Sequence, residues 1–402
     1  MPVTPRHRLA ALVAALVAVP AALLAQDWDY GTRNTPHLAP AFAGQTRAPK
    51  LVTTPPPRVE VVARGLEHPW GIAVLPDGRY LVTERPGRLR LVGRDGTVSA
   101  PVANLPAVLA RRQGGLLDVA IAPDFATSRR IYLTYAKPLG GALSATAAAT
   151  ALLSADGRAL EALREIFVQD PPSPTPAHYG ARILPDGDHL WITTGEHFTE
   201  AERRLAQDPA ASYGKVIRLG ADGSLPPDNP FAGGPGAAPQ VWSLGHRNIQ
   251  GAAIEPATGA LWTLEHGPRG GDELNRIEKG ANYGWPVVSY GENYDGTPIG
   301  SGKAHGAGFT EPRYFWDPVI APGGFQFYTG TLFAGWRGNV IAASLNPGGV
   351  VRLVLDGDRV TGEERLLHRQ ARIRDVEIDR DGAILVLTDE PQGRILRLSP
   401  GG

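Results

Sequence analysis

The sequence predicts an all-β fold, a six-bladed β-propeller. Three observations lead to it: a strand-and-turn phrase that recurs six times, an excess of turn-forming residues, and a length that the six copies nearly fill. The chain has 402 residues, of which 49 are Gly and 37 are Pro, about a fifth of the chain where roughly an eighth is usual. With 43% apolar residues it can still bury a core, so it is a globular protein of short elements and many turns.

The recurring phrase is an apolar strand, a turn such as Pro-Asp-Gly, a second apolar strand that ends in Thr and an acidic residue, and a strand reading Arg-Leu. Short alternating strands joined by Asp-Gly turns are typical of β-hairpins. The copies start 47 to 73 residues apart, and a unit of that length with about four strands is typical of a propeller blade. The six copies begin at Gly71, Asp118, Ala181, Gly251, Gly324 and Asp375.

The ends of the repeat region predict how the ring closes. The last copy ends at Leu398, so residues 59–63 are expected to supply the strand that completes its blade. An open arrangement of two sheets is the alternative, but it would leave many strand edges unpaired, and closure removes them. Residues 58–402 are therefore expected to form one domain, in which the weakly patterned stretch 140–162 is an irregular outer hairpin.

Two segments precede the propeller. Arg6 and Arg8 stand before an uncharged apolar run, residues 9–25, and this order predicts a signal peptide over residues 1–25 and a periplasmic or secreted protein. A retained membrane anchor is the alternative, although the run is at the short limit for spanning a bilayer. Residues 26–57, rich in Pro and Ala, are expected to be an extended linker rather than a folded unit.

Composition excludes several classes of function. The chain has no Cys, so disulfides, thiolate metal sites and thiol catalysis are ruled out. Its 40 basic and 40 acidic residues balance, whereas a protein that binds nucleic acid usually presents a basic face. We therefore expect no nucleic-acid partner.

In a propeller, the loops that lead into the inner strands meet over the central channel, so unusual polar residues in them are candidates for function. His178 precedes the inner strand of the third copy, and an imidazole can take a proton from a bound hydroxyl near neutral pH. The alternative is an ordinary hydrogen-bonded loop histidine. Arg247 and Asn248 precede the fourth copy and offer donors to carboxylates or carbonyls, unless they only hold their own loop together.

Two further segments combine charge with loop geometry. In residues 265–273, glycines and Pro268 leave backbone carbonyls free to point inward beside carboxylates, which suits a cation such as Ca²⁺; a glycine-rich connection with solvated charges is the alternative. Arg372 and Arg374 are two residues apart on a strand, so their side chains point the same way. They form either an anion clamp in the channel or a pair of solvated charges.

Taken together, these segments resemble the soluble pyrroloquinoline quinone (PQQ)-dependent aldose or glucose dehydrogenases, a family that includes sorbosone-dehydrogenase-like proteins. The similarity runs from about Arg58 to Leu398. It implies oxidation of aldose sugars at the anomeric carbon to lactones, with PQQ and Ca²⁺ as cofactors and an external quinone, cytochrome or dye as electron acceptor. The most specific stretches are GLEHPWGIAVLPDG, QGGLLDVAIAPDF, GKVIRLGADGSLPPDNPF, LGHRNIQGAA, EHGPRGGDELNRIEKGANYGWP and RIRDVEI.

The resemblance also implies roles for single residues. His178 matches the base that takes the proton of the anomeric hydroxyl while hydride passes to C5 of PQQ, with Glu196 at its partner position and Arg247 at the quinone. The implied cofactor-binding residues are Gln113, Arg247, Asn248, Asn346, Arg372 and Arg374. The implied calcium ligands are the backbone carbonyls of Gly267 and Pro268, with Glu273 and Tyr283 at further calcium sites. Arginines suit the three carboxylates of PQQ, and a nearby cation makes a quinone more electrophilic.

Three residues depart from the family pattern. Glu196 stands where Asp is usual beside the histidine, His266 replaces a commoner Gln, and Asn346 occupies a position where a PQQ-binding Lys is expected. Glu196 concerns the carboxylate that partners the base, His266 the surroundings of the calcium site, and Asn346 the affinity for the cofactor. They leave open a propeller that binds a sugar or a partner protein without turnover, and a calcium-dependent lactone hydrolase is a further alternative.

Overall fold

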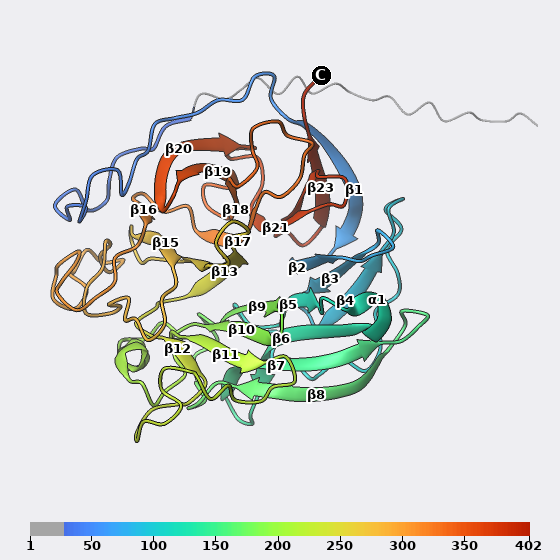
Figure 1. The fold of residues 1–402 in the computed structure, drawn as a ribbon, viewed down its shortest axis with the longest axis horizontal. Helices are drawn as coiled ribbons and strands as arrows, with labels where there is room; N and C mark the ends of the chain where they lie inside the picture. The colour runs from blue at the N-terminus through green and yellow to red at the C-terminus, as the bar shows by residue number, and fades with distance from the viewer. Residues whose placement is uncertain (1–27) are drawn as a thin grey trace, which may run out of the picture.

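The computed structural model describes residues 28–402, and the predicted signal peptide lies outside them. Six antiparallel sheets are arranged around a common centre (Figure 1). The first strands of the six sheets contact one another in ring order. This arrangement confirms the six-bladed propeller, and the six inner strands start within three residues of the predicted copies.

Each blade is an antiparallel meander whose strands follow one another outward. In chain order, the blades are β2 (Pro69–Val74), β3 (Tyr80–Glu84) and β4 (Arg88–Val92); β5 (Leu116–Ile121), β6 (Arg130–Pro138), β7 (Ser144–Leu153) and β8 (Leu160–Val168); β9 (Gly180–Asp186), β10 (His189–Thr194), β11 (Val216–Gly220) and β12 (Val241–Ser243); β13 (Ile249–Ile254), β14 (Leu261–Glu265), β15 (Asp272–Arg276) and β16 (Tyr314–Trp316); β17 (Pro322–Phe327), β18 (Val340–Ser344), β19 (Gly349–Asp356) and β20 (Arg359–Leu366); and β21 (Ile373–Ile378), β22 (Ile384–Thr388) and β23 (Gly393–Ser399). Three one-turn helices lie in loops: α1 (Phe125–Ser128), α2 (Glu200–Arg203) and the 3₁₀ turn η1 (Arg204–Gln207).

The ring closes through the first strand of the domain. β1 (Arg58–Leu66) pairs antiparallel with β23, from Arg58 opposite Ser399 to Leu66 opposite Gly393. Figure 1 shows β1, near the start of the chain, beside the strands of the C-terminal blade. The predicted closing strand is thus confirmed, and it ties the two ends of the domain together and pairs the exposed edge of β23.

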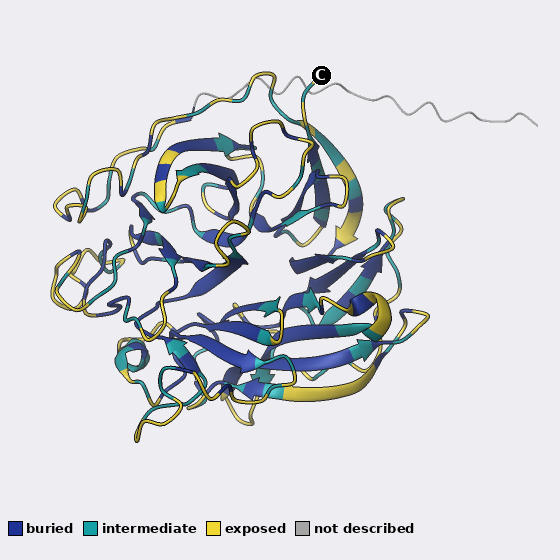
Figure 2. Cartoon of the chain, viewed as in Figure 1, coloured by how far each residue is buried: buried dark blue, intermediate teal, exposed yellow. Residues whose placement is uncertain are grey.

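The core includes six large apolar clusters, one at each interface between neighbouring blades. Because each sheet packs between two others, its middle strands are buried on both faces, as in β3, β14 and β22. Figure 2 shows the buried residues gathered in the blades and the exposed ones in the loops and along β8. Wedge-shaped packing of this kind holds the inner strands in place and leaves the loops free to carry function.

A buried ion cluster ties the inner strands together at the centre. The guanidinium of Arg182 on β9 contacts Asp118 on β5 at 2.8 Å and Asp375 on β21 at 3.1 Å. It also donates to the backbone oxygen of Gln250 on β13. Burial raises the pKa of Asp118 to about 7 even though Arg182 opposes the shift. Four of the six inner strands therefore share one charged group, which positions the loops above it.

The stretch 140–162 differs from its predicted form. Residues 144–153 form β7, a regular strand that pairs with β6 along its whole length and with β8. Nearly all of its residues are buried, so both faces carry small apolar or Thr side chains and the alternation that marks a half-buried strand is absent. The predicted outer hairpin is present, since β7 and β8 are the two outer strands of their blade, but the expectation that it is irregular is wrong.

The predicted linker also differs from a free tether. Residues 28–57 contain no regular strand, but they pack on the propeller, with Trp28 and Leu38 buried. The carboxylate of Asp317 accepts hydrogen bonds from the backbone nitrogens of Asn34 at 2.8 Å and Thr35 at 2.9 Å. Buried apolar side chains and these contacts to the connection after β16 hold the segment against the fourth and fifth blades.

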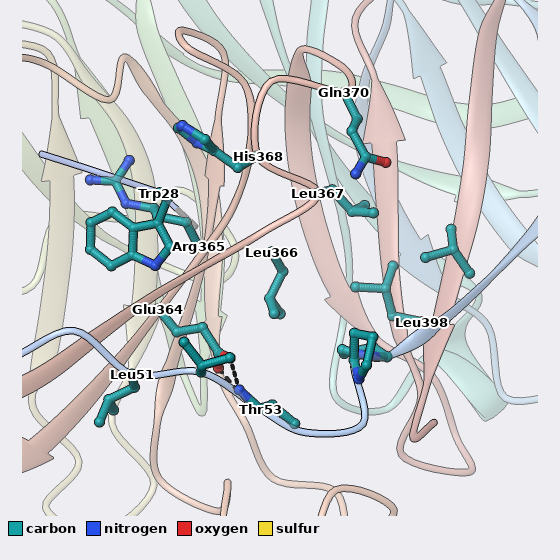
Figure 3. Close-up of a pocket in the computed structure, with 14 residues that line it drawn as sticks. Trp28, Leu51, Thr53, Glu364, Arg365, Leu366, Leu367, His368, Gln370 and Leu398 are labelled. Atoms are coloured by element: carbon teal, nitrogen blue, oxygen red, sulfur yellow. Dashed lines mark hydrogen bonds between the residues drawn. The ribbon is translucent and has the colours of Figure 1, made fainter. Parts of the chain in front are cut away.

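A small cavity lies under this segment, at the rim of the fifth and sixth blades. Its volume is about 60 Å³, and Trp28, Leu51, Leu366 and Leu398 are among the residues that line it (Figure 3). Thr53 closes it with a hydrogen bond from its hydroxyl to Glu364 at 3.0 Å. Leu367, His368 and Gln370, in the connection between β20 and β21, also line it. Within residues 28–402, no helix is long and apolar enough to span a bilayer.

Candidate active site

The loops that lead into the inner strands bring the predicted polar residues to one mouth of the ring. His178 immediately precedes β9, and its ring Nδ1 lies 2.9 Å from Oε2 of Glu196. Its backbone nitrogen donates to Oε1 of Gln113 at 2.8 Å, and its φ is +47°. A non-glycine residue with this φ is uncommon and is held in place by its surroundings. The structure thus pairs His178 with Glu196 and fixes the imidazole from two sides.

The electrostatics of this pair favour a neutral imidazole. Burial lowers the pKa of His178 below its ordinary 6.5; the carboxylate of Glu196 opposes the shift and the charge of Arg247 adds to it. Burial alone would raise the pKa of Glu196, but His178 and Arg247 lower it overall. An ionised carboxylate can only accept, so the Nδ1 atom carries the proton and Nε2 is left with a lone pair. The pair is therefore arranged as a base and the group that orients it.

Arg247 lies beside this pair and reaches the loop after β14. Its Nη1 atom donates to the backbone oxygens of His266 at 2.9 Å and Gly267 at 2.7 Å. Its Nε lies 4.0 Å from Oε1 of Glu196, and the guanidinium lies over the ring of Trp285 at 5.2 Å. The loop carbonyls thus hold the guanidinium against the carboxylate that supports the base.

Two arginines of the last blade reach the same mouth from the opposite side of the ring: Arg374 lies on β21, and Arg372 immediately precedes it. Arg374 is buried and donates to Oε1 of Gln250 at 2.6 Å and to Oδ2 of Asp389 at 2.5 Å. Arg372 is half exposed; it donates to the backbone oxygen of Leu345 at 3.1 Å and lies 3.9 Å from Asp389. Both side chains therefore point to one side, as their spacing predicts. One is fixed and the other is accessible to solvent.

Asn346 and Asn248 lie on the loops around these arginines. Asn346 follows the carbonyl that Arg372 contacts and is exposed at the rim. Asn248 is buried, and its carboxamide oxygen accepts the backbone N–H of Gly180 at 3.0 Å. Because that oxygen is engaged, the amide nitrogen of Asn248 is the group left to donate to a ligand.

The expected metal ligands lie together in the fourth blade: Gly267, Pro268 and Tyr283 are on its loops and Glu273 is on β15. Arg247 occupies the carbonyl of Gly267, and the backbone nitrogen of Gly267 donates to Asp272 at 2.7 Å. Burial raises the pKa of Glu273 well above its ordinary value, and neighbouring Glu265 adds to the rise. Tyr283 points its hydroxyl at the backbone of Arg276, so only its carbonyl could serve a cation. Residues 28–402 contain no group of three or more His, Cys, Asp or Glu side chains arranged to hold a metal.

Several buried polar atoms around the mouth have no hydrogen-bond partner among the described residues. They are Glu196 Oε1, Arg247 Nε, His266 Nε2 and Arg374 Nε. Burial lowers the pKa of His266 far below its ordinary value, and the nearby charges of Arg374 and Arg247 add to the effect. These groups lie near one another, since the charges of Arg374, Arg247 and His178 all lower the pKa of His266. Unsatisfied buried polar atoms are costly to a protein. The Nε atoms of Arg247 and Arg374 can only donate, so they indicate a place for an anionic or hydrogen-bond-accepting ligand.

Some residues of the mouth were not singled out from the sequence. Gln250 and Asp389 hold Arg374, and Phe198 packs edge-on against His178 with ring centroids 5.2 Å apart. Asp389 ends the second strand of the last repeat, in the position where the phrase carries an acidic residue. That repeat signal could have identified it. Nothing in the local sequence marks Phe198.

Comparison with known proteins matches this architecture. Residues 66–397 match the family model described as glucose / sorbosone dehydrogenase. The chain is 42% identical over 346 residues to the aldose sugar dehydrogenase YliI of Escherichia coli K12, covering 85% of this chain and 92% of that protein. A crystal structure of a glucose dehydrogenase superposes with a TM-score of 0.83 at 44% identity, over 86% of this chain and all of that one.

A third relative is a solved structure with a cofactor. The PQQ-bound form of an aldose sugar dehydrogenase from Streptomyces coelicolor superposes with a TM-score of 0.70 at 28% identity, covering 85% of this chain and 98% of that chain. The family match spans most of the propeller, and the E. coli relative is similar over nearly its whole length. The chain therefore belongs to the glucose / sorbosone dehydrogenase family of sugar-oxidising enzymes.

Proposed function

We propose that this protein oxidises aldoses at the anomeric carbon to lactones, with PQQ as the hydride acceptor and Ca²⁺ at the cofactor. The observation that carries the proposal is the set of groups at the mouth: an oriented, neutral imidazole lies near two arginines whose Nε atoms have no hydrogen-bond partner. To remove a hydroxyl proton beside an anionic cofactor, an enzyme needs a base and, near it, groups that bind the anion.

His178 serves as the general base. Its Nε2 accepts the proton of the anomeric hydroxyl, and the imidazolium that forms is stabilised by Glu196, which lies 2.9 Å from Nδ1. The departure from Asp to Glu is accommodated, since the longer side chain reaches both the imidazole and the backbone nitrogen of Phe198. Bound PQQ would supply the electrophilic quinone that accepts hydride from the same carbon.

The cofactor would be held by groups whose hydrogen-bonding capacity the protein leaves unused. Arg374 presents its free Nε, and Arg372 presents a half-exposed guanidinium to a carboxylate. Arg247 and the amide nitrogen of Asn248 are placed to donate to quinone oxygens, and Gln113 borders the same loop as the base. The residues present thus fit an anionic quinone, with Asn346 contributing a neutral amide in place of a cation.

Calcium would be held mainly by backbone oxygens. The carbonyls of Gly267 and Pro268 lie on the loop beside Arg247, and each carbonyl has two lone pairs, so an oxygen that accepts from a guanidinium can also face a cation. Glu273 and the carbonyl of Tyr283 are proposed for a further calcium site in the same blade. Oxygen donors on an irregular loop suit Ca²⁺ better than the more demanding Mg²⁺.

The proposal extends to the location of the enzyme and its redox partner. The apolar run at residues 9–25 is proposed to be a cleaved leader that exports the protein to the periplasm or medium. Reduced cofactor would then pass its electrons to an external quinone, cytochrome or dye.

Titration of the purified protein with PQQ in calcium buffer tests the function. We expect saturable PQQ binding, which is measured by quenching of tryptophan fluorescence because Trp285 lies beside Arg247. We also expect reduction of a dye only when glucose or another aldose is added together with PQQ. A folded protein that binds no PQQ at millimolar calcium would contradict the proposal.

Arg372→Ala is expected to weaken PQQ binding about five- to tenfold. The loss is slightly below the ~1.5–3 kcal/mol range for one charged hydrogen bond, because the side chain is half exposed. The measurement is the same fluorescence titration, with exposed Arg369→Ala as the matched control. Arg374 is less suitable for this test, since its removal would leave Asp389 buried and unpaired. Equal PQQ affinities for Arg372→Ala and Arg369→Ala would show that Arg372 does not contact the cofactor.

A further inference from the structure

A second cleft opens from the active-site mouth toward solvent. It has a volume of about 400 Å³ and is bordered by Arg247 and Pro268 at its inner end and by Phe198, Arg203 and Tyr294 farther out. Its walls are the loop between β10 and α2 and the long connection between β15 and β16. Any molecule that presents a hydroxyl to His178 therefore has this cleft beside it.

Two aromatic side chains form one wall of the cleft. Phe198 is 44% exposed and Tyr294 is 64% exposed, and they are the aromatic members of the set of large exposed apolar residues in residues 28–402. Their ring centroids are 6.4 Å apart and the planes are 28° from parallel. At that distance no ligand fits between the rings, and both side chains line the cleft. Exposed aromatic pairs that border a cleft are expected to bind something.

The position of Phe198 is enforced at a cost in backbone strain. His197 has φ of +62° and Phe198 has φ of +80°, a conformation that side-chain-bearing residues rarely adopt. Two contacts maintain it: the carboxylate of Glu196 accepts the backbone N–H of Phe198, and His197 is held at 2.8 Å by Gln169. Glu196 therefore orients the base and places the aromatic ring against it.

Polar groups lie along the opposite edge of the cleft. Arg203 donates to Oδ1 of Asn293 at 2.9 Å, and its guanidinium lies 6.0 Å from the ring centre of Trp285. Asp295 is exposed and belongs to the same lining. An aromatic face with polar groups at its edge matches a sugar ring, whose C–H face carries partial positive charge toward the ring and whose hydroxyls point sideways.

We propose that Phe198 and Tyr294 are specificity-determining residues that form a two-part sugar platform. Phe198 contacts the ring of the aldose whose hydroxyl faces His178. Tyr294, one ring farther out, contacts the next sugar of a disaccharide or longer chain. The proposal rests on the proposed aldose oxidation, and it assigns the outer part of the cleft to the non-reacting sugar unit.

Binding of analogues that cannot be oxidised separates this proposal from catalysis. 1,5-Anhydroglucitol and 1,5-anhydromaltitol lack the anomeric hydroxyl, and their affinities for PQQ- and calcium-loaded protein can be measured by calorimetry. We expect Tyr294→Ala to weaken the anhydromaltitol complex about five- to tenfold and to leave the anhydroglucitol complex unchanged. Phe198→Ala should weaken both, whereas Tyr294→Phe should retain wild-type affinities.

Leu225→Ala is the matched control, because Leu225 is 53% exposed and lies outside the cleft lining. An unchanged ratio of the two affinities in Tyr294→Ala, or unchanged affinities in Phe198→Ala, overturns the proposal, as does a wild-type protein that binds neither analogue. Dye reduction with glucose and maltose is recorded in parallel. If wild type oxidises the sugars and the variants bind both analogues as wild type does, only the platform is rejected. If analogue binding depends on both rings but no sugar is oxidised, only the proposed reaction is rejected.

Discussion

His178→Asn is expected to lower kcat for aldose oxidation by about 10²-fold or more while PQQ binding persists. The asparagine keeps a polar group beside Glu196 but removes the Nε2 lone pair, so the anomeric proton has no acceptor. The cofactor contacts proposed for Arg372 and Arg374 come from another blade and are unaffected. Dye-coupled initial rates give kcat, and the fluorescence titration gives the PQQ affinity.

The pH profile supplies an independent readout for the same residue. The base must be neutral to accept a proton, so kcat/KM rises with pH through the pKa of His178. Burial lowers that pKa below 6.5, so the acid limb should lie below pH 6.5 in wild type and disappear from the residual activity of His178→Asn. His305→Asn, at an exposed histidine, should behave as wild type. A rate within a few-fold of wild type for His178→Asn would show that the proton goes elsewhere.

Removal of divalent metal is expected to abolish aldose oxidation, and Ca²⁺ should restore it far better than Mg²⁺. The proposed ligands are carbonyls on an irregular loop, which tolerate the larger ion and cannot impose octahedral geometry on the smaller one. The measurement is dye reduction after chelation and dialysis, with metal content determined on the same samples. Full activity in excess chelator, with no metal bound, would reject the assignment.

The second calcium site has its own control. Because Glu273 is proposed to bind a calcium ion away from the cofactor, Glu273→Gln should reduce the rise in Tm that calcium produces, since a ligand stabilises only the state that binds it. The variant should retain the calcium-dependent PQQ binding assigned to Gly267 and Pro268. An equal calcium-induced rise in Tm in wild type and Glu273→Gln would remove Glu273 from the ligand set.

The repeat pattern was sufficient to predict the blades and the closing strand. The phrase of alternating strands and tight turns occurs in six copies, three of them with Asp-Gly at the first turn. Each copy can bury its apolar faces against its neighbours in a closed ring. The prediction failed at β7, where burial of both faces removes the alternation, and at residues 28–57. A segment rich in Pro and Ala is typical of a linker. Only its contacts with distant hydrogen-bond acceptors, such as Asp317, show that it packs on the propeller.

The fold and the loops that carry the polar residues could be predicted from the sequence, because both depend on local periodicity and on order along the chain. Which of those residues meet could be seen only in the folded ring. His178 reaches Glu196 across 18 residues, and Arg374 reaches Gln250 across 124. The folded ring also shows that Arg374 is buried while Arg372 is half exposed, and that Phe198 lies beside Tyr294. These outcomes depend on how six blades close around one centre, and contacts between distant loops leave no periodic trace in the sequence.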